Sequence, residues 1–563
     1  MFLLLLVLPG LLADENLFTN PGFENTDGWI CNSCKGSLVS DSHGGSHSYK
    51  VEQRKYNWGG ISQEVFIQPG HNYYFKAYVK LLNTADGKQY HDIEGMLDII
   101  DTAGNHKYDT FGKTGFVTAG DWFAVGGDYY VPHNTESIRY YLQIPEVGVN
   151  YLIDDAELTH IPYISNFISQ TDDQIDHIRK ANLSITLGGS NPSALEIDVQ
   201  QTRSDFGWGS AVNVDYIHDS KHRNYQNFFY DIFEWGVLEN ALKWPNLEQT
   251  KGIFKPGNAL AAIDAMRARG IKLRGQNMFW GGETHVPSWQ KTLTPADLKL
   301  ELEKHIIDMV TTFRGKLEQW DVNNENIHLH YYEDQLKDPK ITQWLFEYAH
   351  RYDNNTELYL NDYSIVSGQY STVAYQDQAM KFLAANIHVD GIGVQSHLGD
   401  AIDISVIKRR LDEIAKVGLP IWITELDINE SNDLRKAEKY EEVMRLYFSH
   451  PAVKGVMFWG FWDGRHWRPA AALANGHDVT PNAAGKKVKE LLKQTWRTEV
   501  HHSLAHGHTV NMRGFLGSYE LKIRHDGKTI HTETFDLGKN GNHLRINLVG
   551  SGNSTNIGHV IIG

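Results

Sequence analysis

Eight short apolar runs, separated by helical stretches, recur through the middle of the chain and constrain its fold more than any other feature. In order they are FGWGSAV, FEWGVLE, KLRGQNMFW, LEQWDVNNE, ELYLND, GIGVQSH, PIWITELD and GVMFWG. Parallel strands that are buried on both faces read as continuous apolar runs, and eight strand-helix units close into a (β/α)8 or TIM barrel. We therefore predict a TIM-barrel domain over residues 161–497, including a lead-in segment before the first strand.

Both flanks of the predicted barrel have a different, β-rich pattern. Residues 15–160 are short alternating runs broken by Gly, Asn and Asp, which is typical of an antiparallel β-sandwich. Residues 498–563 return to alternation around a hairpin signal at His525-Asp526-Gly527 and predict a small C-terminal β-unit. The predicted fold class is thus multidomain, with an N-terminal antiparallel β-sandwich, a TIM barrel and a C-terminal β-rich appendage.

The first 13 residues form an apolar run of signal-peptide length that is too short to span a bilayer. We expect cleavage near Ala13 and a secreted, extracellular protein, although the usual positive charge at the start is missing. The two cysteines, Cys31 and Cys34, predict a local disulfide in an oxidising compartment. Four sequons are compatible with N-glycosylation, at Asn182, Asn354, Asn429 and Asn553.

Charge and aromatic content narrow the class of partner. The net charge of -16 disfavours binding to nucleic acid or to anionic membranes. Aromatic residues make up 12% of the chain and include 15 Trp, and such rings suit the C-H faces of sugars as well as large cores. A carbohydrate partner therefore fits the composition better than a polyanion does.

Glu325 follows the apolar part of the fourth run and Glu425 that of the seventh, so each of these two strands places a glutamate near its carboxyl end. Active residues of this fold lie at the carboxyl ends of the strands, where the fourth and seventh strands face each other across the barrel mouth. One carboxylic acid can then protonate a glycosidic oxygen while the other attacks or stabilises the anomeric carbon, without a cofactor. The alternative is that each glutamate forms an ion pair with a barrel lysine.

Ordered motifs in this region carry a family resemblance. From about residue 175 to the tail the chain resembles glycoside hydrolase family 10, mostly endo-β-1,4-xylanases, in the motifs VLENALKW, RGQNMFW, WDVNNE, NDY, GVQSH, ITELDI and FWGFWDGRHW. The resemblance implies that Glu325 is the acid/base and Glu425 the nucleophile of a retaining double displacement, with carboxyl groups roughly 5 to 5.5 Å apart. It also implies that His397 and Asp427 hold and orient Glu425.

The same resemblance implies a set of substrate contacts. These are Glu239, Asn240, Lys243, Gln276, Asn324, Tyr363 and Gln395, with Trp280, Trp459 and Trp467 as walls of the cleft. One position departs from the family pattern, because most members have a histidine where this chain has Gln276. Glutamine can bind a sugar hydroxyl but carries no proton near neutral pH, so β-1,4-glucan stays open as a substrate beside xylan.

The N-terminal segment resembles carbohydrate-binding modules of families 4, 9 and 22 in its NPGFEN and IDDAEL motifs. The resemblance implies glycan contacts from Trp58, Tyr141 and Gln143. It also implies a structural calcium held by Glu24 and Asp155, because hard cations prefer carboxylate oxygens.

Together these features predict a secreted, endo-acting retaining xylanase that binds plant cell-wall polysaccharide and needs no cofactor for catalysis. Two alternatives remain at this point. One is an endo-β-1,4-glucanase or a dual enzyme acting on cellulose or mixed-linkage glucan. The other is a non-catalytic glycan-binding protein that uses the barrel as a lectin.

Overall fold

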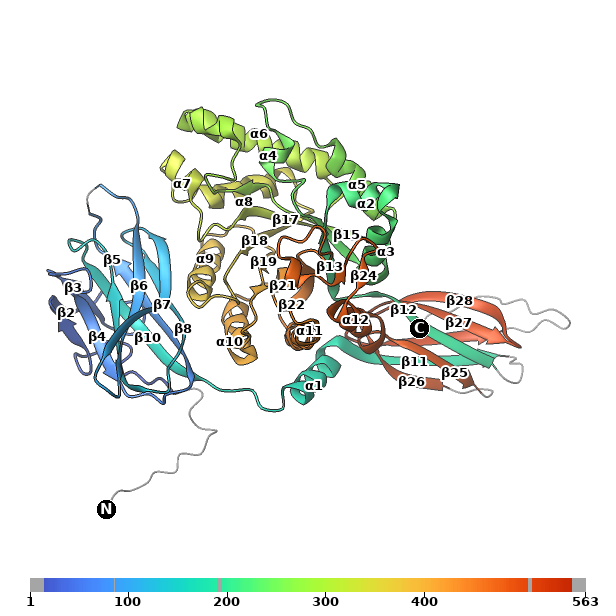
Figure 1. The fold of residues 1–563 in the computed structure, drawn as a ribbon, viewed down its shortest axis with the longest axis horizontal. Coiled ribbons are helices and arrows are strands. Elements are labelled where there is room, and N and C mark those ends of the chain that lie inside the picture. The colour runs from blue at the N-terminus through green and yellow to red at the C-terminus, as the bar shows by residue number, and fades with distance from the viewer. Residues whose placement is uncertain (1–14, 86, 190–194, 505–508, 549–563) are drawn as a thin grey trace, which may run out of the picture.

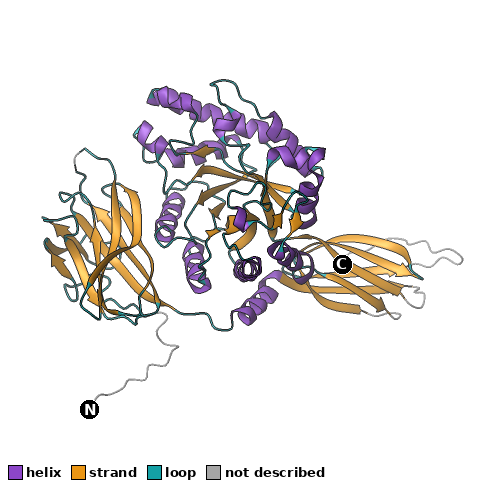
Figure 2. Cartoon of the chain, in the orientation of Figure 1, coloured by secondary structure: helices purple, strands orange, loops and turns teal. Residues whose placement is uncertain are grey.

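The computed structural model describes residues 15–85, 87–189, 195–504 and 509–548. A barrel lies in the middle, with a β-sandwich on the N-terminal side and a second β-unit on the opposite side (Figure 1). Nearly all of the helices surround the barrel, whereas both outer units are built from strands (Figure 2). The predicted signal peptide and the sequon at Asn553 lie outside the described residues. Within those ranges, no helix has the length and apolarity needed to cross a membrane.

The N-terminal unit is a sandwich of two five-stranded antiparallel sheets, which confirms the predicted fold class. One sheet has the order β1 (Ile30–Asn32), β4 (Gly60–Val65), β9 (Thr135–Gln143), β6 (His91–Asp101) and β7 (His106–Val117). The other has the order β2 (Lys35–Val39), β3 (Ser48–Glu52), β10 (Tyr151–Ile161), β5 (Asn72–Leu81) and β8 (Trp122–Tyr130). Alternate residues of both sheets, among them Val79, Leu97 and Phe111, form the core between them.

Eight parallel strands form a closed barrel, as the apolar runs predict. They are β13 (Gly207–Val212), β14 (Trp235–Leu238), β15 (Lys272–Gly275), β17 (Gln319–Asn324), β18 (Glu357–Asp362), β19 (Gly391–Val394), β21 (Ile421–Ile428) and β22 (Val453–Phe458). Two short strands, β16 (Phe279–Trp280) and β20 (His397–Leu398), extend the sheet at its mouth, beside β17 and β21. The small hairpin of β23 (Ala474–Asn475) and β24 (Thr480–Pro481) follows the last barrel strand.

The helices of the barrel surround these strands and bury their apolar faces against them. They are α2 (Val214–His218), α3 (Arg223–Ile232), α4 (Trp244–Leu247), α5 (Gly257–Arg267), α6 (Pro295–Phe313), α7 (Tyr331–Leu336), α8 (Ile341–Tyr352), α9 (Thr372–Ala384), α10 (Ile404–Ala415), α11 (Asp433–Ser449) and α12 (Ala483–Glu490). Short 3-10 turns cover Ser220–His222, Ser288–Thr292 and Pro469–Ala471, and a π-turn covers Leu491–Thr495. Helix α1 (Phe167–Arg179) links the sandwich to the rest of the chain.

The C-terminal β-unit differs from the predicted division of the chain. Two strands that precede the barrel, β11 (Lys180–Gly189) and β12 (Leu195–Ser204), pair with the C-terminal strands instead of staying with the barrel. One sheet has the order β26 (Thr509–Phe515), β11, β29 (Asn542–Leu548), and the other β25 (Glu499–Leu504), β12, β27 (Gly517–His525), β28 (Lys528–Leu537).

The reason for this pairing is the alternating pattern of the lead-in strands. Leu183, Ile185 and Val199 each lie on one face, and the closed barrel offers no edge to cover that face. They pack instead against Leu521 and Ile523 of β27. The predicted hairpin is present here, since Asp526 and Gly527 alone join β27 to β28, both with positive φ.

The sandwich lies beside helices α9 and α10 of the barrel (Figure 1). Strand β8 contacts both helices. Arg410 on α10 donates from Nε and Nη2 to the two carboxylate oxygens of Asp128 on β8, each at 2.7 Å, and both side chains are buried. Next to this pair, Tyr74 of the sandwich packs in a cluster with Val373 and Val406 of the barrel. The attachment therefore combines an apolar contact with a buried ion pair.

Candidate active site

Glu325 follows directly on β17 and lies at the barrel mouth. Its backbone has φ 61°, in the left-handed region that side chains other than Gly rarely adopt, and its N–H donates to the carbonyl of Asn361. Its carboxylate accepts from Trp280 Nε1 at 2.7 Å and from Gln395 Nε2 at 3.0 Å. Two side chains thus hold the carboxyl group, and a main-chain bond to β18 holds the Glu325 backbone.

Burial raises the pKa of Glu325 to about 7, against the hydrogen bond from Gln395, which favours the ionised form. The nearby negative charges of Asp362 and Glu425 raise it further. A carboxyl group with such a pKa is protonated in a large share of molecules at neutral pH, as a general acid must be.

Glu425 lies near the end of β21, and its two oxygens have separate partners. Oε2 contacts His397 Nε2 at 3.1 Å, and the other ring nitrogen of His397 contacts Asp427 Oδ2 at 2.9 Å. Burial by itself lowers the pKa of His397, but hydrogen bonds to Asp427 and Glu425 outweigh it and raise the pKa to about 9. At neutral pH the ring is therefore an imidazolium between two carboxylates, and it donates to both.

The second oxygen of Glu425 accepts from Gln276 Nε2 at 3.1 Å, and Asn361 Nδ2 lies 3.5 Å away. Gln276 is buried at the end of β15, joined to Asn277 by a cis peptide. The residue that replaces the family's usual histidine therefore contacts the predicted nucleophile itself. Its amide donates a hydrogen bond that does not change with pH.

Asn324, the last residue of β17, has one donor that no described residue uses. Its Oδ1 accepts from Asn361 Nδ2 at 2.9 Å, and Asn361 Oδ1 in turn accepts from Thr424 at 2.7 Å, which fixes the orientation of both amides. Asn324 is fully buried, yet its Nδ2 has no hydrogen-bond partner among the described residues. Such a buried donor is suited to a ligand hydroxyl beside Glu325.

Glu239 and Lys243 follow β14, the second strand of the barrel, and both lie near Glu425. Burial raises the pKa of Glu239 and lowers that of Lys243, while the carboxylates of Glu425, Glu239 and Glu325 raise the pKa of the lysine. Lys243 Nζ donates to Asn240 at 2.7 Å. Glu239 and Lys243 therefore lie near the glutamate pair, and Asn240 contacts Lys243.

The predicted aromatic walls differ in exposure. Trp459 is 8% exposed and belongs to a buried cluster inside the barrel, whereas Trp467 is 54% exposed. Trp467 Nε1 donates to Asp427 Oδ2 at 2.7 Å, and its ring lies edge-on to His397. A small cavity on this side is lined by Asn213, Tyr225, Glu239, Trp459, Trp462, Arg465 and Trp467, among others.

Tyr363 lies beyond β18 on the other side of Glu325. Its ring stacks on His328 with centroids 3.9 Å apart, and His328 Nδ1 lies 2.6 Å from an Asp362 oxygen. Burial raises the pKa of Tyr363, and the charges of Asp362 and Glu325 raise it further. The phenol thus stays a neutral donor next to Glu325.

Two residues at this site were missed by the sequence predictions. Arg468 Nη1 reaches the second oxygen of Asp427 at 3.2 Å, and the ring of His285 stacks on Trp280 with centroids 3.5 Å apart. Arg468 directly follows Trp467, so its place beside a predicted wall was a usable signal. Nothing in the sequence around His285 indicated its contact.

In the sandwich, the loop between β3 and β4 carries an exposed pair of rings. Tyr56 and Trp58 are 51% and 45% exposed and stack with centroids 4.8 Å apart at 10°. Tyr141 and Gln143 lie on β9, and Gln143 Nε2 donates to Glu94 on the neighbouring strand. The loop and the end of β9 meet where Ile144 N–H donates to the Asn57 carbonyl. These predicted glycan contacts are therefore near one another and distinct from the barrel mouth.

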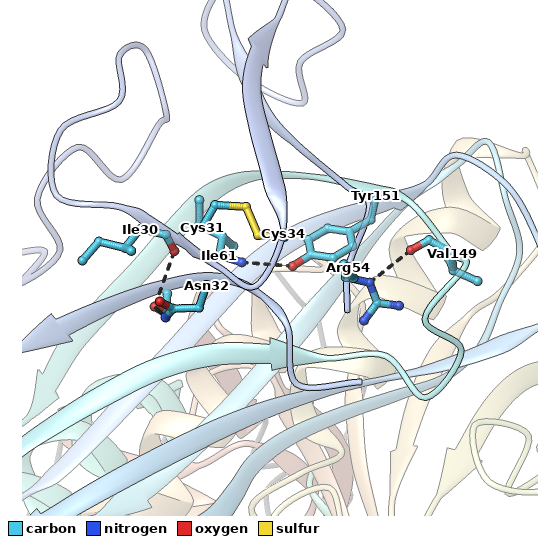
Figure 3. Close-up of a disulfide and its surroundings, with 9 residues drawn as sticks. Ile30, Cys31, Asn32, Cys34, Arg54, Ile61, Val149 and Tyr151 are labelled. Carbon is cyan, nitrogen blue, oxygen red and sulfur yellow. Dashed lines mark hydrogen bonds between the residues drawn. A yellow bond between two sulfur atoms is a disulfide. The ribbon is translucent and has the colours of Figure 1, made fainter. Parts of the chain in front are cut away.

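The buried Arg54 donates from Nε to the carbonyl of Val149 (Figure 3). Its Nη1 also donates to the carbonyls of Asn57 and Ile144. Cys31 and Cys34 form a disulfide next to the start of β4. A buried guanidinium with carbonyl partners thus fixes the Tyr56–Trp58 loop against the loop after β9.

The predicted calcium ligands already have other partners. Glu24 Oε1 accepts from the Ser46 N–H at 2.6 Å, and Asp155 Oδ2 contacts His43 Nδ1 at 2.6 Å. Across the described ranges, no group of three or more His, Cys, Asp or Glu side chains is arranged to hold a metal ion. The structure therefore does not confirm the predicted calcium, which stays a prediction from sequence.

Comparisons with known proteins decide the family. Residues 199–491, which contain the barrel, match the model of "Glycosyl hydrolase family 10". The chain belongs to glycosyl hydrolase family 10. Residues 15–148 match a "Carbohydrate binding domain". Both matches agree with the resemblances found in the sequence.

Similar curated proteins include the anti-sigma-I factor RsgI6 of Acetivibrio thermocellus, 32% identical over 67% of this chain and 49% of that protein. Endo-1,4-beta-xylanase 2 of Arabidopsis thaliana is 31% identical over 72% of this chain and 38% of that protein. The chain spans between 38% and 54% of the length of the first four such relatives. A solved Clostridium thermocellum structure of CBM22-1 and GH10 modules with xylohexaose is 19% identical, with a TM-score of 0.47 over 86% of this chain and 99% of that chain.

Proposed function

We propose that the protein is an endo-acting retaining glycoside hydrolase that cleaves internal β-1,4-xylosidic bonds of xylan. The observation that carries this proposal is the contrast between two glutamates in one barrel mouth. Glu325 has a pKa raised to about 7, while Glu425 contacts the imidazolium of His397. Two carboxyl groups in such different surroundings suit an acid and a nucleophile.

In the first step Glu425 attacks the anomeric carbon while Glu325 gives its proton to the leaving oxygen. His397 and Asp427 hold one oxygen of Glu425 and Gln276 holds the other, so attack needs little reorientation. The free Nδ2 donor of Asn324 is placed to bind a hydroxyl of the sugar beside the bond. A glycosyl-enzyme ester and a shortened chain result.

In the second step water hydrolyses the ester, and Glu325, now ionised, takes a proton from that water. Trp280 and Gln395 donate to this carboxylate and stabilise its ionised form. Displacement occurs twice at the same carbon, so the product keeps the anomeric configuration. The predicted carboxyl separation of roughly 5 to 5.5 Å belongs to this proposal.

Xylan as the substrate is supported by the names of several relatives, which are endo-1,4-beta-xylanases of Arabidopsis thaliana and Thermoanaerobacterium saccharolyticum. The test is product analysis on xylan, carboxymethylcellulose and mannan, with the anomeric form of the first product followed by NMR. Release of β-configured xylooligosaccharides supports the proposal. Faster cleavage of carboxymethylcellulose would assign the protein to glucan instead.

Replacement of each glutamate tests the roles directly. Glu425→Ala should abolish hydrolysis and, with azide, give the inverted glycosyl azide. Glu325→Ala should slow cleavage of xylan by about 10² to 10⁴-fold and spare the first step with an activated aryl xyloside. Activity of the wild type should fall as the pH rises above about 7, where Glu325 loses its proton. Unchanged turnover in Glu425→Ala would eliminate the assignment.

We further propose that the sandwich binds polysaccharide through Trp58, Tyr141 and Gln143. The exposed Tyr56–Trp58 ring pair supports this, since flat rings stack on sugar faces. Trp58→Ala should weaken retention on insoluble xylan and spare cleavage of soluble oligomers. Equal retention of the variant and the wild type would contradict it.

Secretion is part of the proposal, and the Cys31–Cys34 disulfide supports it because disulfides persist in oxidising compartments. Recovery of the protein from the culture medium of its source tests this point.

Chelation with EDTA tests the predicted calcium, because loss of a bound calcium would lower the melting temperature of the sandwich.

A further inference from the structure

The side chain of Trp280 is held by three neighbours at the barrel mouth. Its Nε1–H donates to Glu325 Oε2 at 2.7 Å, and Lys243 Nζ lies 4.7 Å from its ring centroid. The imidazole of His285 stacks on the indole with centroids 3.5 Å apart and an interplanar angle of 9°. The indole that contacts the predicted acid is therefore covered on one face by a histidine.

The chain reaches this arrangement through a tight loop after β16. The His285 N–H donates to the Gly282 carbonyl at 2.8 Å, which folds the loop back over Trp280. A Cβ atom on Gly282 would lie 2.6 Å from His285 Cδ2, so only glycine leaves room for the ring. The Gly281 carbonyl accepts from the Tyr331 N–H at 2.8 Å, which ties the loop to α7.

We propose that His285 is a positioning residue of this active site, whose ring holds the Trp280 indole where its N–H reaches Glu325. The inference rests on the proposed function and deepens it. Its basis is the parallel stack, the turn that creates it and the direct contact of the same indole with the acid. His285 acts through Trp280 and does not itself touch the reacting atoms.

The protonation state of the His285 imidazole agrees with this positioning role. Burial lowers the pKa of His285, and the positive charge of Lys243 lowers it further, so the ring is neutral near pH 7. A neutral flat ring stacks on indole and adds no charge next to Glu325. One face of Trp280 is thereby unavailable to a sugar, while its N–H reaches Glu325.

Loss of the stack should free the indole to rotate and weaken its bond to Glu325. A donated hydrogen bond stabilises the ionised carboxylate, so its loss raises the pKa of Glu325. The second step of the reaction uses that ionised form as a base. His285→Ala should therefore lower kcat about tenfold, the size of one hydrogen bond to a charged group, with little change in KM.

The test compares four variants of the full chain. His285→Phe keeps a flat ring and should retain most of the activity, whereas His285→Leu fills the space without a flat ring and should behave like His285→Ala. His350→Ala is the matched control, because His350 stacks on His388 with centroids 3.8 Å apart away from the predicted site. Steady-state kcat and KM on xylohexaose and the pH profile are measured for each.

A second readout does not need turnover. The pKa of Glu325 is followed by NMR of 13C-labelled glutamate carboxyl groups, assigned with Glu325→Gln, and should rise in His285→Ala and His285→Leu but not in His285→Phe. If the wild type cleaves no polysaccharide, the proposed function fails, while this titration still tests His285. An unchanged pKa together with a kcat equal to that of His350→Ala would overturn the inference. An equal loss of kcat in His285→Phe and His285→Leu would also overturn the inference.

Discussion

The two β-units that flank the barrel are attached to it in different ways. The N-terminal sandwich is complete within residues 15–161 and contacts helices α9 and α10 through side chains such as Asp128 and Tyr74. The C-terminal unit takes β11 and β12 from before the barrel and β25 to β29 from after it. Its sheets therefore join the two ends of the barrel segment by main-chain hydrogen bonds.

This difference determines which units can unfold alone. A unit that is continuous in sequence has its own core and can separate from its neighbour when the contact between them breaks. A unit made from both flanks of the barrel cannot form before the barrel ends meet, and its loss releases both ends. We expect the barrel to be coupled in stability to the C-terminal unit far more tightly than to the sandwich.

The largest expected effect is that of truncation. Removing residues 498–563 leaves the apolar faces of β11 and β12 uncovered, so the product should be insoluble or unfolded. Removing residues 1–160 takes away a complete sandwich, so the remainder should stay soluble and keep the circular dichroism of the barrel, with a lower melting temperature. Soluble yield and thermal melts are measured for both truncated chains. Equal solubility of the two truncated chains would remove the proposed distinction.

A smaller effect is expected at the sandwich contact. Asp128→Asn leaves the buried Arg410 without a partner charge, and breaking a buried pair costs about 3–5 kcal/mol. The change should separate the unfolding of the sandwich from that of the barrel, seen as two transitions in urea. A single transition at the wild-type midpoint would show that the pair is not what joins the two units.

Two matched core substitutions test whether the two flanking units differ in their coupling to the barrel. Leu97 in the sandwich and Leu521 in the C-terminal unit are both fully buried, and Leu→Ala in a core costs about 2–5 kcal/mol. Leu521→Ala should lower the melting temperature of the barrel, whereas Leu97→Ala should lower only that of the sandwich. Hydrogen exchange of barrel amides distinguishes the two. Equal protection in both variants would contradict the coupling.

The smallest effect is expected at the edge of the sandwich contact. Asn72 Nδ2 donates to Asp403 at 2.9 Å in an exposed position, where a hydrogen bond contributes about 0.5 kcal/mol. Asn72→Ala should leave the two units unfolding together, with a barely shifted urea midpoint. A loss of stability as large as that of Asp128→Asn would mean that the exposed rim, and not the buried ion pair, holds the sandwich to the barrel.

The sequence by itself determined the barrel and the two glutamates. Continuous apolar runs identify strands that are buried on both faces, and the polar residue after each run must then lie at the barrel mouth, as Glu325 and Glu425 do. Most of the predicted barrel contacts came from the family resemblance. His397 between Glu425 and Asp427 and Gln395 on Glu325 lie where strand ends place them.

Only the tertiary structure decided which distant segments meet. Alternation in β11 and β12 indicates that one face of each strand is buried, but it does not say which strands cover that face, and the partners lie about three hundred residues away in sequence. The stack of His285 on Trp280 and the buried pair of Arg410 and Asp128 depend on loop geometry and on docking between units. Local pattern specifies the kind of surface a segment presents, whereas the identity of its partner is fixed by packing in three dimensions.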